Sequence, residues 1–325
     1  MTKLHAIGEV LIDFISNQKQ CNLKDVTTFE KVLGGAPANV AISIAKYGAR
    51  SSLITQVGKD GFGDYLIETL ASNRVDTSYI KQTKEANTGL AFVSVQENGE
   101  RDFSFFRNPS ADLLLKPTDI KKEWFEEGDY LHFCSVDLVD SPMKQTHKEA
   151  IKFVKEKGGV ISFDPNVRLS LWNCPDKCKT AIQEFLPFAN IVKVSDEELE
   201  FITEEENEAK ALESLFIGDV QVIIYTKGKD GAIILTKEKS FQHPGYAVKV
   251  EDTTGAGDSF IGSLLYILVC NHVRKEQLVP FIFENHSKLL VFANAGAALT
   301  TTGKGALSSL PTLEQVEKFI KQQGE

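Results

Sequence analysis

A glycine turn that precedes an apolar helix contains the residue types needed to bind an anion and move a proton. It reads Asp252-Thr-Thr-Gly-Ala-Gly-Asp258. Gly255 and Gly257 let the backbone approach a ligand, and the first N–H groups of the helix have no partner within it. These donors and the helix dipole favour an anion. A carboxylate beside an anion needs a reason, and Asp258 as general base toward a hydroxyl that attacks phosphorus supplies one. The alternative is an ordinary helix start, in which Asp258 only interacts with the dipole.

A second glycine segment, Gly34-Gly-Ala-Pro-Ala-Asn39, leads into another apolar helix. Gly34 and Gly35 would allow backbone amides to approach a hydroxyl. Asn39 lies four residues after Gly35, so its side chain could project toward the same place, although it could also only stabilise the turn. Asp13, expected at the end of the first strand, offers two acceptor oxygens. The segment therefore predicts a site for a ligand with several hydroxyl groups.

The two segments together resemble the two signatures of the PfkB (ribokinase-like) carbohydrate kinase family. The upstream signature covers residues 34–48 and continues at 58–63, and the downstream one covers 252–260. Two long motifs in this order are far more specific than a lone glycine pattern. The resemblance extends over residues 7–311. It implies that the amides of Gly255, Ala256 and Gly257 stabilise charge on the transferred phosphoryl group.

The composition favours a large folded enzyme. The chain has 325 residues, 42% of them hydrophobic, and can bury a large core. A net charge of −9 without a basic block argues against nucleic-acid or anionic-membrane partners. Neither an 18-residue apolar run nor an apolar signal-peptide core is seen, so a cytoplasmic protein without membrane contact is expected. The five scattered cysteines predict reduced thiols.

Apolar strands and helices alternate along the chain. This indicates an α/β fold with a mainly parallel sheet between helical layers, and the resemblance implies a ribokinase-like three-layer sandwich formed by residues 1–325 as a single kinase domain. Ligands in such sheets bind beyond the carboxyl ends of the strands. Strands are predicted at 4–14, 52–57, 130–134, 160–164, 191–194 and 220–226, and helices at 36–47, 62–73 and 141–157.

One stretch breaks this alternation. Residues 89–106 alternate at period two around Asn98-Gly99, a pair typical of a hairpin turn. The resemblance implies that about 88–108, with about 15–33, form a small β-sheet lid over the sugar. In several relatives this sheet also pairs between subunits, so a homodimer through the lid is one expectation. A simple surface hairpin is the alternative.

Two arginine-containing segments narrow the substrate class. Residues 105–112 and 163–168 resemble fructokinases and 2-keto-3-deoxygluconate kinases of the family. Arg107 and Arg168 are permanently charged donors that could hold a ketose hydroxyl, a sugar-acid carboxylate or phosphate, and Phe105 belongs to the same predicted sugar set. Each arginine could equally be an ordinary surface residue.

Other residues are predicted to contact the nucleotide. Lys193 could offset phosphate charge. Relatives often carry an Asn-x-x-Glu element next, where this chain has Ser195 and Glu198. Glu198 is therefore expected to act on Mg²⁺ through water, and the role of Ser195 is in doubt. A capping box formed by the two residues fits equally well. By resemblance, the ATP site also includes Thr226, Gly228, Gly231 and Asn294.

The family often binds a monovalent cation beside the anion turn. Asp252 and Thr254 match that element, and the weaker candidates for K⁺ ligands are Thr300, Gly303, Gly305 and Ser309.

The predicted function is ATP-dependent, Mg²⁺-requiring phosphorylation of fructose at C6, with Asp258 as the base. A 2-keto-3-deoxygluconate, ribose or nucleoside kinase is the nearest alternative, and a non-catalytic sugar-binding regulator is another. No Gly-x-x-x-x-Gly-Lys-Ser/Thr motif is present, which excludes a P-loop phosphotransferase. The first strand is not followed by Gly-x-Gly-x-x-Gly, which disfavours a Rossmann oxidoreductase.

Overall fold

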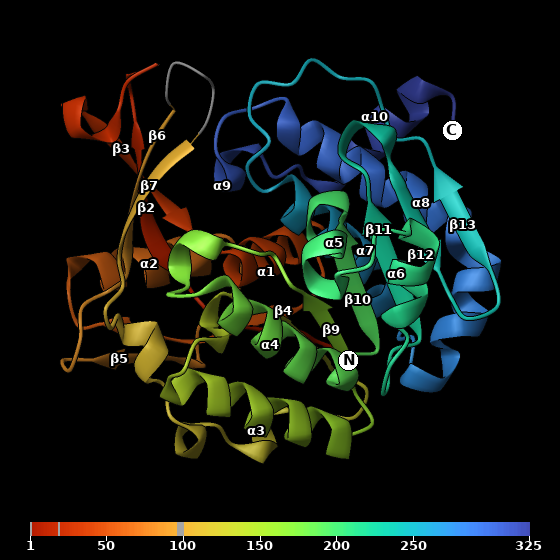
Figure 1. The fold of residues 1–325 in the computed structure, drawn as a ribbon, viewed down its shortest axis with the longest axis horizontal. Helices are drawn as coiled ribbons and strands as arrows, with labels where there is room; N and C mark the ends of the chain where they lie inside the picture. The colour runs from red at the N-terminus through yellow and green to blue at the C-terminus, as the bar shows by residue number, and fades with distance from the viewer. Residues whose placement is uncertain (1, 19, 96–100) are drawn as a thin grey trace.

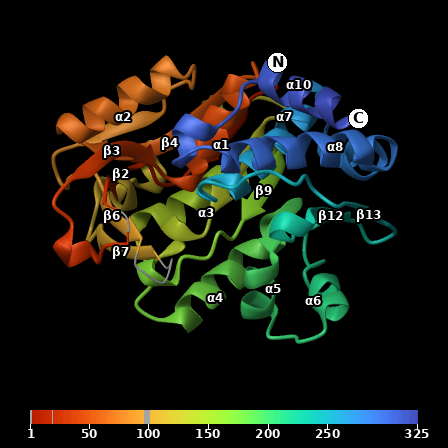
Figure 2. The same ribbon diagram turned by 90° about the horizontal axis from the view of Figure 1, so that it is seen from above.

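The computed structural model describes residues 2–18, 20–95 and 101–325. Helices cover both faces of a large sheet, and a small second sheet lies to one side (Figures 1 and 2). The predicted α/β fold with a mainly parallel sheet is thereby confirmed.

Within the described residues, the strands form two sheets. The large sheet contains β1 Leu4–Ile7, β4 Ser51–Gly58, β5 Ile80–Thr83, β8 Tyr130–Cys134, β9 Val160–Asp164, β10 Ile191–Ser195, β11 Val222–Thr226, β12 Ala232–Leu235 and β13 Ser240–His243. The small sheet contains β2 Leu11–Ser16, β3 Phe29–Gly34, β6 Leu90–Val95 and β7 Arg101–Phe106. The α-helices are α1 Ala36–Lys46, α2 Gly61–Ser72, α3 Pro142–Glu156, α4 Pro175–Phe185, α5 Asp196–Thr203, α6 Glu208–Ser214, α7 Ala256–Cys270, α8 Leu278–Thr301, α9 Ala306–Ser309 and α10 Leu313–Gln323.

The strand order of the large sheet brings the candidate residues to one edge. Among the described residues the order is β13-β12-β11-β10-β9-β8-β1-β4-β5, and all neighbours from β11 to β5 are parallel. Because parallel strands end at the same edge, Asp164, Ser195 and Thr226 lie along it. This is the edge at which such sheets bind ligands.

The predicted strand at 4–14 is wrong as a single strand. The chain leaves the large sheet after Ile7 and enters the small sheet at Leu11. Between them Gly8 has a φ of +143°, and a Cβ there would lie 2.7 Å from the side chain of Pro37. Only glycine fits this close approach to the start of α1. Asp13 therefore lies inside β2 of the small sheet, not at the end of a core strand.

Each face of the large sheet has its own apolar core. Leu4 and Ala6 of β1 pack into the core beneath α1, α2, α7, α8 and α10, whereas Ile7 packs into the core beneath α3, α4, α5 and α6. These alternating contacts fix the register of β1 between the two layers. Among the described residues, no single helix is long and apolar enough to cross a membrane. α7 and the segment 275–301 reach that length only together, across a bend of 105°.

The small sheet combines both predicted excursions. β2 pairs antiparallel with β3 and parallel with β6, and β6 pairs antiparallel with β7, with Leu90 opposite Phe106. The predicted turn at Asn98-Gly99 lies outside the described residues. On one face of the sheet Phe14 and Phe92 stack at 4.8 Å between ring centres. The aromatic residues give this sheet an apolar layer of its own.

Asp60 connects the small sheet to the rest of the fold. It caps α2 by accepting hydrogen bonds from the backbone N–H groups of Phe62 and Gly63 at 3.1 and 2.8 Å. The same carboxylate accepts from the backbone and the hydroxyl of Thr88, just before β6, at 2.9 and 2.8 Å. Asp60, which belongs to the upstream signature, thus holds the segment that leads into β6. The family resemblance did not predict this structural role.

We expect Asp60→Ala to destabilise the fold by more than a helix cap alone, which contributes about 0.5–2 kcal/mol, because it also removes the Thr88 contacts. Asn207→Ala is the matched control. Asn207 caps α6 by accepting from Lys210 N at 3.0 Å, and within the described part of the chain its side chain makes no second hydrogen bond to another segment. Urea unfolding of both variants gives the two losses. Equal losses would contradict the anchoring role.

Candidate active site

The predicted anion turn forms the start of α7. Gly255 caps this helix with a φ of +79°, and a Cβ there would lie 2.7 Å from the Cβ of Ala306. Ala256 and Gly257 begin the helix, and Asp258 lies in its first turn. The backbone N–H groups of this turn and the carboxylate therefore lie together at the positive end of the helix dipole.

Asn39 joins the two glycine segments. Its Nδ2 donates a hydrogen bond to Oδ2 of Asp258 at 2.8 Å, across 219 residues of sequence. Its Oδ1 is buried and, among the described residues, has no hydrogen-bond partner. The structure thus brings the upstream segment, through Asn39, into contact with the first turn of α7.

Gly34 and Gly35 bring the start of α1 close to two other backbone segments. A Cβ on Gly34 would lie 2.2 Å from Oδ2 of Asp13, and one on Gly35, whose φ is +114°, would lie 2.5 Å from the carbonyl oxygen of Glu9. Both positions therefore require glycine. The Asp13 carboxylate thus reaches the start of α1 from the small sheet.

The surroundings of Asp258 suit a proton acceptor. Burial raises the pKa of Asp258 above its ordinary value, while the hydrogen bond from Asn39 and the charges of Arg168 and Lys193 oppose that rise. A carboxylate with a raised pKa holds a proton better than a free one. Asp258 combines this property with a position in the first turn of α7, beside the backbone amides predicted to bind an anion.

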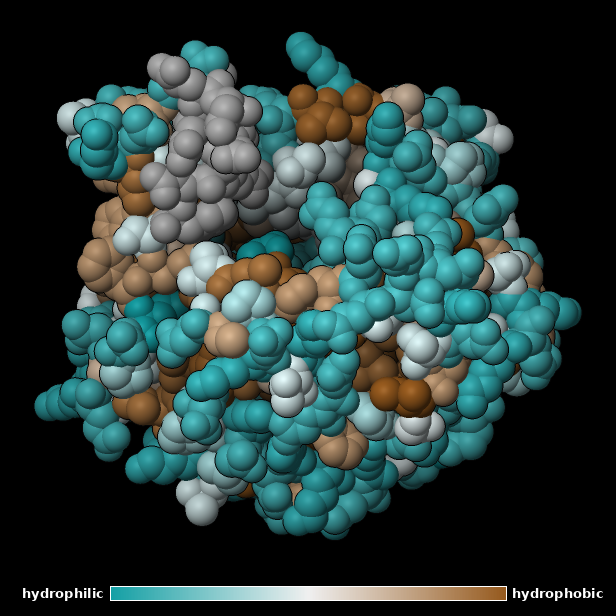
Figure 3. Space-filling model, in the orientation of Figure 1, coloured by the Kyte–Doolittle hydropathy of each residue, from teal (hydrophilic) through white to brown (hydrophobic). Residues whose placement is uncertain are grey.

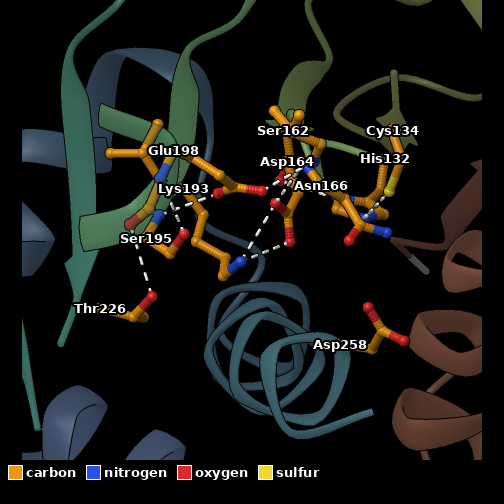
Figure 4. Close-up of polar contacts among 12 residues, drawn as sticks. His132, Cys134, Ser162, Asp164, Asn166, Lys193, Ser195, Glu198, Thr226 and Asp258 are labelled. Carbon is orange, nitrogen blue, oxygen red and sulfur yellow. Dashed lines mark hydrogen bonds and ion pairs between the residues drawn. The ribbon is translucent and has the colours of Figure 1, made fainter. Parts of the chain in front are cut away.

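Lys193 lies between the strand ends and α7. Its Nζ pairs with Asp164 at 2.9 Å and would lie 3.2 Å from a Cβ on Gly257. Figure 4 shows Lys193 between Thr226 on one side and Asp258 on the other. Burial by itself would lower the pKa of Lys193, but the charges of Asp164, Glu198 and Asp258 raise it. A buried, permanently charged ammonium is thus held beside the anion turn.

Asp164 was absent from the predicted site residues. Burial, with repulsion from Glu198 and Asp258, raises its pKa to about 6 despite the attraction of Lys193. It remains ionised at neutral pH and orients the ammonium. Its position at the end of a buried strand, before a proline, was the available signal, because strand-end carboxylates in parallel sheets face the ligand edge.

Ser195 and Glu198 form the capping box that the sequence allowed. Ser195 Oγ accepts from Glu198 N at 3.3 Å, and Glu198 Oε2 accepts from Ser195 N at 2.9 Å. Oε1 accepts from Val167 N at 2.8 Å. Burial would raise the pKa of Glu198, but Lys193 and these backbone donors lower it. Both carboxylate oxygens already have backbone donors, so this geometry suits metal contact through water better than direct ligation.

The predicted nucleotide residues lie on two elements. Thr226 ends β11, and its hydroxyl donates to Val194 O at 3.4 Å. Gly228 and Gly231, with φ values of +52° and +83°, form the turn into β12. Asn294 is buried in α8, where Nδ2 donates to Leu290 O at 2.8 Å. The structure places Thr226 at the ligand edge, whereas the Asn294 amide is engaged within its own helix.

Five of the six candidate K⁺ ligands lie in two chain segments, 252–254 and 303–309, that contact each other through Asp252 and Gly305. Asp252 accepts from the backbone and hydroxyl of Thr254 at 2.9 and 2.6 Å and from Gly305 N at 3.0 Å. A Cβ on Gly303 would lie 2.5 Å from Ser309 Oγ. Thr300 differs, because its buried hydroxyl donates to Gly296 O within α8 at 2.8 Å. Two chain segments thus converge beside the anion turn.

The two arginines have unlike surroundings. Arg107 is buried and forms ion pairs with Asp112 and Asp137. Arg168 is exposed, donates to Val167 O at 2.9 Å and lies near enough to Asp258 to lower the pKa of that carboxyl group.

Phe105, which is half-buried in β7, lies opposite Ala91 of β6. In Figure 3 the surface is hollowed between the small sheet and the C-terminal part of the chain.

The large sheet with its helical layers, the small separate sheet and the site at the strand ends define a ribokinase-like fold, and solved structures share it. A fructokinase from Xylella fastidiosa with bound ATP has a TM-score of 0.90 and 31% identity, with 99% of each chain covered. A fructokinase from Vibrio cholerae O395, bound to fructose, ADP and calcium, has a TM-score of 0.87 and 34% identity, with 98% of this chain and 99% of that one covered.

Known sequences give the same assignment. The model of the pfkB family carbohydrate kinases matches residues 1–313, so the chain belongs to this family. A probable fructokinase-2 of Arabidopsis thaliana is 39% identical over 98% of this chain and 96% of its own length. Fructokinase-2 of Oryza sativa subsp. japonica is 38% identical over 97% of this chain and 93% of its own length.

Proposed function

We propose that the protein is a fructokinase, which transfers the γ-phosphoryl group of ATP to the C6 hydroxyl of fructose. The observation that carries this proposal is the hydrogen bond from Asn39 to Asp258, which joins both signature segments at the start of α7. The relatives are named fructokinases, and two similar structures hold ATP or fructose with ADP. These names support fructose above ribose or a sugar acid.

Different residues would carry out proton transfer, charge stabilisation and sugar binding. Asp258 accepts the proton of the C6 hydroxyl as its oxygen attacks the γ-phosphorus, and the bond from phosphorus to ADP breaks. The amides at 255–257 and the Lys193 ammonium stabilise negative charge on the transferred group. Asp13 and Asn39 would bind sugar hydroxyls at the start of α1. The small sheet would act as a lid that excludes water, with its bounds near 15–33 and 88–108.

The carboxylates near Lys193 suit a hydrated Mg²⁺ ion. Among the described residues, no group of three His, Cys, Asp or Glu side chains is placed to hold a metal. Glu198 would therefore hold the ion through water, with the remaining ligands from phosphates, and the ion would supply charge neutralisation. Asp252, Thr254, Gly303, Gly305 and Ser309 would form the K⁺ site.

A pH prediction follows from the Asn39 contact. Asn39 stabilises the ionised form of Asp258, so Asn39→Ala should raise the pKa of Asp258 further. The acid limb of the kcat/KM profile should then move to higher pH. Asn73→Ala is the control, because the Asn73 side chain donates to Thr69 O at the end of α2. An unmoved limb in Asn39→Ala would contradict the contact's role.

The substrate is tested by turnover with ATP on fructose, mannose, ribose, tagatose and 2-keto-3-deoxygluconate. The proposal predicts the highest kcat/KM for fructose. A higher value for ribose or for the sugar acid would replace fructokinase by that kinase. The absence of turnover with every sugar, in a folded protein that still binds sugar, would favour a non-catalytic regulator.

The small sheet would also join two copies of the chain. Phe106, at the end of β7, is 61% exposed, and it packs edge-on against Phe92 at 5.5 Å between ring centres. An exposed aromatic residue on a small sheet suits contact with a second copy. Phe106→Glu should shift a dimer toward the monomer in sedimentation velocity. A wild-type monomer would contradict this part of the proposal.

A further inference from the structure

Arg107 is enclosed by carboxylates. It follows β7 and is buried, and its Nη2 donates to Asp112 and, at 2.5 Å, to Oδ1 of Asp137. Asp112 and Asp137 are 1% and 0% exposed. Water therefore contributes little to screening these charges, and the guanidinium is balanced within the protein.

Glu9 adds a third carboxylate and connects this group to the start of α1. It is 3% exposed, and its Oε1 accepts from Ala36 N at 3.0 Å. Burial raises its pKa to about 7, although the charge of Arg107 opposes that rise. Oε2 of Glu9 and Oδ2 of Asp137 are buried without a hydrogen-bond partner among the described residues. Glu9 thus retains an acceptor oxygen beside the predicted sugar-binding turn, and Asp137 retains one beside Arg107.

The charges in this group do not sum to a cation. Burial and repulsion from Asp112 raise the pKa of Asp137 well above its ordinary value, although the charge of Arg107 opposes that rise. Even when Glu9 and Asp137 both hold protons, the Asp112 carboxylate offsets the one guanidinium, so the group carries no net positive charge. Nε of Arg107 is nevertheless a buried donor with no partner among the described residues. A donor in a group without net positive charge can bond a neutral hydroxyl, but it offers no unbalanced charge to attract a carboxylate.

The other cationic side chains near the site, Lys193 and Arg168, do not provide a strong attraction for the carboxylate of a sugar acid. Lys193 is paired with Asp164 and lies on the phosphate side. Arg168 is exposed, so water and salt weaken its attraction for an anion. A sugar acid would therefore find no unbalanced buried cation on the sugar side among the described residues.

We propose that Asp112, Asp137 and Glu9 make Arg107 a selectivity element that admits a neutral sugar and disfavours a sugar acid. This inference rests on the proposed kinase function. It reassigns Arg107, which the sequence offered equally as a partner for a sugar-acid carboxylate. The three carboxylates act on the substrate's charge through Arg107 and are positioning residues.

The test compares kcat/KM for fructose with that for 2-keto-3-deoxygluconate, whose carboxylate is the feature of interest. The ratio should be at least about 100 in the wild-type protein and should fall roughly 10-fold in Asp137→Asn and in Asp112→Asn, because each replaces one of the two acidic groups bonded to the guanidinium. Asp219→Asn is the control. Asp219 pairs with Lys155 at 2.8 Å and precedes β11, at the opposite edge of the sheet. Its ratio should be unchanged.

The possible results distinguish the selectivity role of Arg107 from the proposed kinase function. An unchanged ratio in both folded carboxylate variants, or a wild-type ratio near one, would overturn the selectivity role while leaving the kinase function intact. Failure of the wild-type protein to phosphorylate any neutral sugar would instead overturn the proposed function. If both variants fail to fold, calorimetric binding of gluconate and glucitol to the wild-type protein decides, since these differ only in the terminal carboxylate. Equal affinities would overturn the inference, and tighter binding of glucitol would support it.

Discussion

Replacement of Asp258 by asparagine is expected to lower kcat by at least about 100-fold, with only a modest change in the affinity for the sugar. Asparagine has nearly the shape of aspartate but cannot accept the hydroxyl proton. The surrounding amides and Lys193 do not depend on this carboxylate for their positions, because Lys193 is held by Asp164 at 2.9 Å. Substrate binding should therefore survive the loss of the base.

Steady-state kinetics with saturating ATP would measure this change. Sugar binding by calorimetry would separate affinity from turnover, and Asp219→Asn would control for the loss of one carboxylate at the far edge of the sheet. A kcat in Asp258→Asn close to that of the wild-type protein would refute the assignment of the base. A large loss of sugar affinity without a loss of kcat would make Asp258 a binding residue instead.

The sequence pattern alone predicted the two glycine turns that precede α1 and α7. A glycine that must adopt a positive φ before an apolar helix leaves a local pattern, and both Gly35 and Gly255 show it. Asn39 could be placed because residues three or four apart share a helix face. The parallel sheet was predictable for a similar reason, since its buried strands form short apolar runs bounded by turns.

Contacts between distant segments left no such pattern. The apolar residues around Gly8 read as one strand, and only their packing against Pro37 shows that the chain changes sheets there. Asp164 gains its role from the register that places β9 beside β10 and so beside Lys193. The ion pairs of Arg107 depend on Asp137, 30 residues away, so the sequence could not distinguish a balanced arginine from a free one.

The second large effect concerns stability at acid pH. His147 of α3 is fully buried between the rings of Phe133 and Phe185, and its Nδ1 donates to Met143 O at 2.8 Å. Burial lowers the pKa of His147 to about 4. In the unfolded chain the pKa of histidine is about 6.5. Between these values the unfolded state binds more protons, so the free energy of unfolding falls as the pH falls from about 6.5 toward 4.

At pH 5 this histidine alone should cost about 2 kcal/mol of stability relative to pH 7, a substantial part of the roughly 5–15 kcal/mol typical of a folded protein. The buried carboxylates with raised pKa values act in the opposite direction, because they take up protons in the folded state. Because these carboxylates are unchanged in His147→Asn, comparing this variant with the wild-type protein measures the contribution of the histidine.

We expect urea unfolding at pH 7 and pH 5 to show a smaller loss of unfolding free energy in His147→Asn than in the wild-type protein, by about 2 kcal/mol. His272→Asn, at an exposed position, should retain the wild-type loss. Equal losses in all three proteins would show that His147 is not held neutral by its burial.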